Sequence, residues 1–278
     1  YVIDTGILTT HTEFTGRLLP GMNFAGGAIG TSDCNGHGTH VAGTIGGTTY
    51  GVAKGVDLVP VRVFDCLGST LVSTIISGIN WVVTDHASLV PAVANLSLGV
   101  DTISPELDAA IQTMIDDNIT VVVATGNDGI DSCTVSPAHV PGAITVNASD
   151  TTDHYSVWTP TLSSNFGACS DLYAPGTNIT SAGISSNTAS AALSGTSMAS
   201  PHVAGVAARV LQDHPELTPT SVWGAINGET TTNVTGRGGL DTNKLLFITP
   251  GIATTPSAST TARAAADISA IVGDGSGL

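Results

Sequence analysis

Three short segments contain side chains that could act together in nucleophilic catalysis. Ser197 stands between small residues in the stretch GTSMASPHVAG (195–205), His37 stands among glycines in NGHGTHVAG (35–43), and Asp4 lies in VIDTG (2–6). A serine hydroxyl is a weak nucleophile until a neighbouring base takes its proton. Histidine can be that base, and a carboxylate can hold the imidazole in the required tautomer. These residue types therefore point to acyl transfer.

Each of the three residues stands where an element of secondary structure is expected to begin or end. The apolar run 203–211 after Ser197 is typical of a buried helix, and Pro201 is tolerated because it lies near the helix start. A helix N-terminus offers N–H groups to a developing negative charge. Asp4 follows a hydrophobic strand, and open α/β sheets build their active sites at the carboxyl ends of parallel strands.

Short runs rich in Val and Ile alternate along the chain with segments of helical spacing. The runs show little polar alternation, which indicates parallel strands covered on both faces. Strands are expected at 1–3, 58–64, 92–98, 120–124 and 143–146, and helices at 70–86 and 105–117. This order predicts an α/β fold, with a three-layer, doubly wound, mostly parallel sheet and helices on both faces.

The composition narrows the choice of partners. The chain has 278 residues, a formal net charge of −15 and only seven Lys and Arg, so it cannot present the basic face that nucleic-acid phosphates need. No uninterrupted apolar run is long enough to span a bilayer. We therefore expect neither a nucleic acid nor a membrane as partner.

The order of the three residues along the chain separates two kinds of hydrolase. In the α/β-hydrolase esterases the serine comes first and the histidine last. Here the order is Asp4, His37, Ser197, and the only histidine beyond the helix of the serine is His214. The order matches subtilisin, which disfavours an esterase.

The segments around Asp4, His37 and Ser197 resemble the signatures of the subtilisin-like serine proteases, in the proteinase K branch, over roughly residues 1–248. The resemblance implies a secreted serine endopeptidase that works through an acyl-enzyme. Ser197 would be the nucleophile, His37 the general base and acid, and Asp4 the group that orients the imidazole. Asn127 matches the asparagine that stabilises the oxyanion in this family. His40 is then expected to be a structural residue of the helix.

The resemblance also implies where a substrate would bind. An extended peptide would add as a strand between two edges of the site, and a pocket with small, uncharged walls would favour apolar or aromatic side chains. One edge comprises Gly68, Ser69 and Thr70, the other Ser97, Leu98 and Gly99, and the pocket walls Ala124, Thr125 and Gly126. Relatives commonly have glycine at the positions of Thr70 and Val100, so the reaction type is easier to infer than the specificity.

The four cysteines indicate an extracellular protein with two disulfides. They are even in number, well separated and form no C-x-x-C pair, and they allow three different pairings. The resemblance to aqualysin-type relatives implies that Cys34 pairs with Cys66 and Cys133 with Cys169.

A calcium ion is the one cofactor that the resemblance implies, and no organic cofactor is expected. The carbonyl oxygens of Pro141 and Ala143 and the carboxylate of Asp171 would hold it. Oxygen ligands of this kind suit Ca²⁺, with water filling the other positions.

The composition changes after about residue 250, where Thr, Ala, Ser and Gly predominate. We expect a peptidase domain over 1–250 and a flexible tail or linker over 251–278. The chain has no initiator Met or signal peptide, and relatives carry more residues before the catalytic aspartate, so we expect an N-terminal segment to be missing. The resemblance implies a monomer, protein and peptide substrates, and an inhibitory propeptide in the precursor. A non-catalytic form is the alternative from another class.

Overall fold

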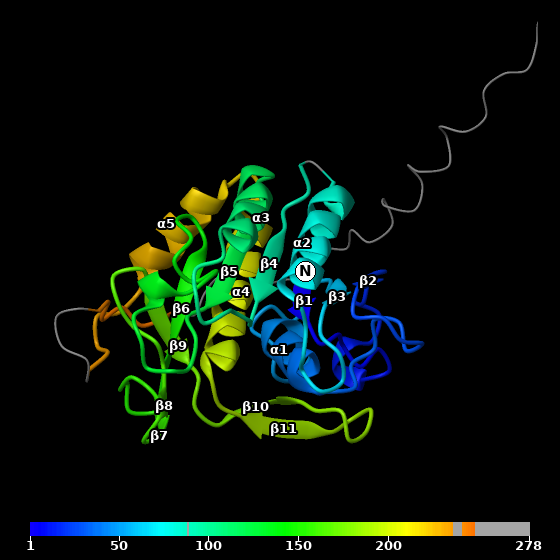
Figure 1. Cartoon of the computed structure of the whole chain (residues 1–278), viewed down its shortest axis with the longest axis horizontal. Coiled ribbons are helices and arrows are strands. Elements are labelled where there is room, and N and C mark those ends of the chain that lie inside the picture. Colours follow the sequence, from blue (N-terminus) through cyan, green and yellow to red (C-terminus); the bar gives the residue numbers. More distant parts are fainter. Residues whose placement is uncertain (88, 236–240, 248–278) are drawn as a thin grey trace, which may run out of the picture.

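A central sheet of seven parallel strands organises the chain (Figure 1). The computed structural model describes residues 1–87, 89–235 and 241–247. The strands lie in the order β2-β3-β1-β4-β5-β6-β9. Their bounds are β1 Val2–Asp4, β2 Met22–Asn23, β3 Pro60–Arg62, β4 Val93–Leu96, β5 Thr120–Ala124, β6 Ile144–Ser149 and β9 Leu172–Pro175. The strand order reverses at β1, so the carboxyl end of β1 lies at the kind of position where doubly wound folds bind ligands.

Helices cover both faces of the sheet. One hydrophobic cluster contains residues of α1 (His37–Gly46), α4 (Thr196–Asp213) and α5 (Pro219–Glu229), and the other contains residues of α2 (Val72–Asp85) and α3 (Pro105–Asp116). Short elements surround these layers: the 3₁₀ helices η1 (Thr12–Phe14) and η2 (Ser132–Thr134), and the antiparallel pairs β7 (Val157–Thr159) with β8 (Leu162–Ser163) and β10 (Ile179–Ala182) with β11 (Ser190–Leu193).

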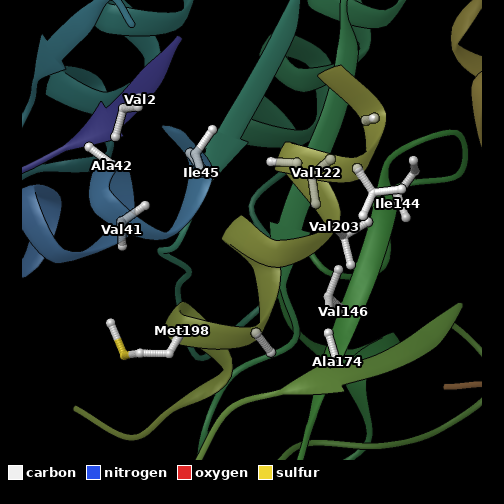
Figure 2. Close-up of a cluster of buried hydrophobic side chains, with 14 of the residues drawn as sticks. Val2, Val41, Ala42, Ile45, Val122, Ile144, Val146, Ala174, Met198 and Val203 are labelled. Atoms are coloured by element: carbon white, nitrogen blue, oxygen red, sulfur yellow. The ribbon is translucent and has the colours of Figure 1, made fainter. Parts of the chain in front are cut away.

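The central strands are apolar on both sides because each side faces its own hydrophobic core. Successive side chains of a strand point to opposite faces. Val122 of β5 accordingly belongs to the cluster with α1 and α4, while Val121 and Val123 belong to the cluster with α2 and α3. Figure 2 shows Val122 and Val203 in the first cluster, where α4 packs against the sheet. This two-sided burial explains the near-continuous Val and Ile runs of the sequence.

The predicted fold class is confirmed, and the element bounds differ by a few residues. The strand expected at 58–64 forms β3 only over Pro60–Arg62. The expected range was longer because Leu58 and Val63 are also apolar and buried, although they lie outside the strand. The hairpins β7–β8 and β10–β11 were not predicted. The expected tail, 251–278, lies outside the described residues. Among the helices of the described part, none is long and apolar enough to cross a membrane.

Candidate active site

Asp4 and His37 meet where β1 ends and α1 begins. Asp4 is the last residue of β1 and His37 the first of α1, and His37 Nδ1 donates to Asp4 Oδ1 at 2.7 Å. The Asp4 side chain is 1% exposed and that of His37 is 30% exposed. A Cβ at Gly38 would lie 2.2 Å from the carbonyl oxygen of Gly6. Only glycine at this position lets the start of the helix approach the aspartate so closely.

The surroundings of His37 favour its protonated form. Burial disfavours the imidazolium, but the charge of Asp4, its hydrogen bond and the charge of Asp33 outweigh burial and raise the pKa of His37. A histidine that gains a proton readily while remaining partly open to solvent has the properties of a general base.

Ser197 lies in the first turn of α4, as predicted. In a helix the N–H of residue 201 would bond to the carbonyl of residue 197, but Pro201 has no N–H. The carbonyl of Ser197 instead accepts a hydrogen bond from Ser97 Oγ at 2.8 Å. The hydroxyl of Ser197 donates to the Ser97 carbonyl at 3.1 Å, and no hydrogen bond joins it to His37, which the structure also describes. The nucleophile candidate is therefore tied to the segment after β4.

The side chain of Asn127 is oriented by Thr196. Asn127 Oδ1 accepts both the backbone N–H and the hydroxyl of Thr196, each at 2.9 Å. Since a backbone N–H can only donate, the oxygen of the amide must face Thr196, which directs Nδ2 elsewhere. A Cβ at Gly195 would lie 3.6 Å from Asn127 Nδ2 and 3.7 Å from the backbone nitrogen of Ser197. Asn127, the expected oxyanion donor, and the backbone N–H of Ser197 therefore border the same space beside Gly195.

A cavity of about 250 Å³ opens beside these groups. Its lining includes Ser197 and Asn127 together with five of the expected substrate-binding residues, Leu98, Gly99, Ala124, Thr125 and Gly126. Val100, which the resemblance singled out as a departure from the glycine of relatives, also lines the cavity, and sequence reasoning missed the other lining residues, Asp101, Asp128, Val135, Ser136, Ala138, Asn165 and Thr196. Asp128 directly follows Asn127, so its position could have been inferred, whereas Asn165 reaches the cavity only through folding.

The other expected edge, Gly68, Ser69 and Thr70, does not line this cavity. Ser69 and Thr70 line a second cavity of about 300 Å³ together with residues such as Phe24 and Leu71. Gly68 lies near Asn35, since a Cβ at Gly68 would be 3.4 Å from Asn35 Nδ2. Ser97, directly after β4, is buried and contacts Ser197 through the hydrogen bonds described above.

The four cysteines form two disulfides. Cys34 is bonded to Cys66 and Cys133 to Cys169, the pairs that the resemblance implied. No described cysteine is free. Cys34 of the first disulfide lies three residues before His37. The second disulfide joins η2 to the loop before β9.

Asp171 directly precedes β9 and lies beside the start of β6. Its Oδ2 accepts the backbone N–H of Thr145 at 2.8 Å, and its own N–H donates to the Thr145 carbonyl. Burial raises the pKa of Asp171 to about 6, against the opposing effects of this hydrogen bond and of Lys244. A half-buried carboxylate bonded to Thr145, two residues after Ala143 and four after Pro141, fits a hard cation together with the carbonyls of those two residues. The described residues hold no group of three or more metal-binding side chains, and the expected site needs only one carboxylate.

His40 is fully buried in α1 and its Nε2 lies 2.9 Å from the carbonyl oxygen of Ile179. Burial lowers its pKa, and burial lowers the pKa of the neighbouring His202 on α4 to about 4. These environments disfavour the charged form of both rings, whereas the carboxylates near His37 favour its charged form.

Comparison with known proteins places these features in a family. The model of the subtilase family, peptidase S8, matches residues 1–245. The chain is 52% identical over 250 residues to an extracellular serine proteinase of Thermus sp., covering 90% of this chain and 59% of the relative. It is 45% identical to alkaline serine exoprotease A of Vibrio alginolyticus, covering 89% and 44%. The chain thus spans about half the length of these curated relatives.

A solved structure agrees with this assignment. The crystal structure of a cold adapted subtilisin-like serine proteinase superposes with a TM-score of 0.83 at 46% sequence identity, covering 89% of this chain and 87% of that one. The match over residues 1–245, the identities and the fold together show that the chain belongs to the subtilase family.

Proposed function

We propose that the protein is an extracellular serine endopeptidase that hydrolyses peptide bonds through an acyl-enzyme. The observation that carries the proposal is the 2.7 Å hydrogen bond between Asp4 and His37 at the start of α1, with Ser197 at the start of α4. Names of relatives such as extracellular serine proteinase support the location and the activity. The proposal includes protein and peptide substrates and an inhibitory propeptide in the precursor.

In the proposed mechanism, substrate binding releases the serine hydroxyl. The hydroxyl of Ser197 donates to the Ser97 carbonyl in the free protein. A substrate strand that adds beside residues 97–99 would donate its own N–H to that carbonyl. The hydroxyl could then turn toward His37, and hydrogen bonds of this kind often tighten only when substrate is bound. His37 would take the proton while Asp4 stabilises the imidazolium.

His37 then returns the proton to the leaving amine, and water attacks the acyl-enzyme in the reverse sense. Asn127 Nδ2 and the backbone N–H of Ser197 would stabilise the oxyanion in the space beside Gly195. Donors fixed in advance, as Asn127 is fixed by Thr196, stabilise developing charge without reorganisation.

The first prediction concerns the nucleophile. Ser197→Ala should lower kcat for a peptide amide by about a million-fold and abolish labelling by a phosphonylating reagent specific for active-site serine, because the attacking oxygen is lost. Ser77→Ala, on the exposed side of α2, is the matched control and should label and cleave normally. Absence of labelling in folded wild-type protein would favour a non-catalytic form, and turnover of esters alone an esterase.

The second prediction concerns Asn127. Asn127→Leu keeps the size of the side chain but has no donor, so kcat should fall by about 10²–10³ with little change in KM. The exposed Asn187→Ala is the control, and thermal unfolding checks that the start of α4 is intact. A variant that raises KM and leaves kcat unchanged would argue against a transition-state role.

The third prediction concerns specificity. Residues such as Ala124, Gly126 and Ala138 give the cavity small, neutral walls, and Asp101 and Asp128 add two carboxylates to its lining. We expect apolar or aromatic side chains before the scissile bond to be preferred, and Glu to be disfavoured by about tenfold or more in kcat/KM through like-charge repulsion. The double variant Asp101→Asn/Asp128→Asn should weaken the discrimination, and the exposed Asp213→Asn should not. Equal cleavage of Phe and Glu peptides would contradict this assignment.

The fourth prediction concerns calcium. We infer that Pro141, Ala143 and Asp171 hold a structural Ca²⁺, which would compensate the half-buried carboxylate and take no part in the chemistry. At about a hundredfold excess over Kd the ion should add ~2.7 kcal/mol to the free energy of unfolding. Calcium should therefore raise Tm relative to chelator in the wild type and in Asp213→Asn, and not in Asp171→Asn. A Tm that does not respond to chelator in the wild type would refute the site.

A further inference from the structure

Asp33 is a buried carboxylate for which the proposed mechanism has no use. It lies in the segment before α1 and is 5% exposed. Its Oδ1 accepts hydrogen bonds from Thr5 Oγ1 at 2.9 Å and from the N–H groups of Asn35 at 2.8 Å and Gly36 at 2.9 Å. Its Oδ2 accepts from the N–H of Thr39 at 2.9 Å and from Thr39 Oγ1 at 2.6 Å. An ionised carboxylate only accepts hydrogen bonds, so these donors match it on both oxygens.

These hydrogen bonds join the two segments that carry Asp4 and His37. Thr5 directly follows Asp4, and its hydroxyl donates to Asp33 while it accepts the N–H of Gly38 at 2.8 Å. The hydroxyl of Thr39 similarly donates to Asp33 and accepts the N–H of Leu8 at 2.9 Å. The carboxylate therefore stands between the chain after β1 and the first turn of α1.

We propose that Asp33 is a positioning residue for the protease reaction. Its hydrogen bonds hold the end of β1 against the start of α1, which sets the Asp4–His37 pair. Its negative charge stabilises the imidazolium that His37 forms in each turnover. The inference rests on the proposed function, because it assigns a role within that reaction.

The charged surroundings of His37 support an electrostatic part of this role. Burial disfavours the imidazolium and has the largest single effect on the pKa of His37. The charge and hydrogen bond of Asp4, and then the charge of Asp33, act in the opposite direction and raise this pKa. On α1 itself, the neutral His40 lies nearby. The titratable side chains of the other elements packed against α1 are His202 on α4 and Glu13 and His11 on η1 and its N-cap. The strand β10 has no titratable side chain.

The fifth prediction tests the charge. Asp33→Asn keeps the shape of the side chain but removes the negative charge, so the imidazolium is less stable and the pKa of His37 falls. The acidic limb of the kcat/KM profile should move to lower pH, and kcat should fall by about tenfold with KM little changed. Glu13→Gln is the matched control, because Glu13 is 7% exposed and accepts the N–H of Thr49 at 2.7 Å. The control should lower Tm and leave the acidic limb in place.

A pair of variants at Thr5 tests the hydrogen bonds without changing charge. Thr5→Val removes the hydroxyl between Asp33 and Gly38, and kcat should fall by about tenfold while the acidic limb stays in place. Thr5→Ser restores the hydroxyl and should restore kcat. This pair remains informative if Asp33→Asn does not fold.

The outcomes separate this inference from the proposed function. Wild-type protein that cleaves no peptide contradicts the proposed function itself. An active wild type with an unshifted acidic limb in folded Asp33→Asn would overturn the electrostatic role. Equal kcat values for Thr5→Val, Thr5→Ser and the wild type would overturn the positioning role.

Discussion

The hydrogen bond between Asp4 and His37 depends on bringing a nearly inaccessible carboxylate to the first turn of a helix. The Asp4 side chain is 1% exposed, and its charge is tolerable only where hydrogen bonds and a partner compensate the lost hydration. The N–H of Thr5 donates to the same oxygen as His37, at 2.7 Å. The parallel sheet supplies this geometry, because the strand ends and the helix begins at one edge.

The same constraint explains why glycines and small residues crowd this edge. The approach of α1 to β1 leaves no room for a side chain at Gly38, whose Cβ would lie 3.0 Å from Asp4 Oδ1. On α4, Pro201 has no N–H, so one hydrogen bond of the helix is not formed. The carbonyl of Ser197 that is left free accepts a hydrogen bond from Ser97, so it joins α4 to the segment directly after β4.

Much of the fold and of the candidate triad could be predicted because the signals are local. The strand 120–124 was predicted with the bounds of β5, since its apolar run faces a core on each side. Asp4, His37 and Ser197 each stand in a short motif at an element end. Asp33 stands just before the His37 motif, but its link to the segment after Asp4 is a single contact with Thr5, 28 residues away. Asn165 stands in no such motif, and its contacts are with segments distant in sequence. Asn165, for example, donates to the Thr125 carbonyl at 2.8 Å across 40 residues.

Specificity is harder to infer from sequence than reaction type because the substrate cavity is built from segments that are distant in sequence. The reaction needs a few side chains in fixed frames, but the cavity beside Ser197 is assembled from the segments 98–101, 124–128 and 135–138 together with Asn165. The Val100 N–H donates to the Ser136 carbonyl at 2.8 Å, which holds two of these segments together. Through that contact Asp101, which stands in an unremarkable loop of the sequence, comes to line the cavity with Asp128. The small residues of one segment predict an apolar pocket, and only the folded chain adds Asp101 and Asp128, on which the proposed discrimination against acidic side chains rests.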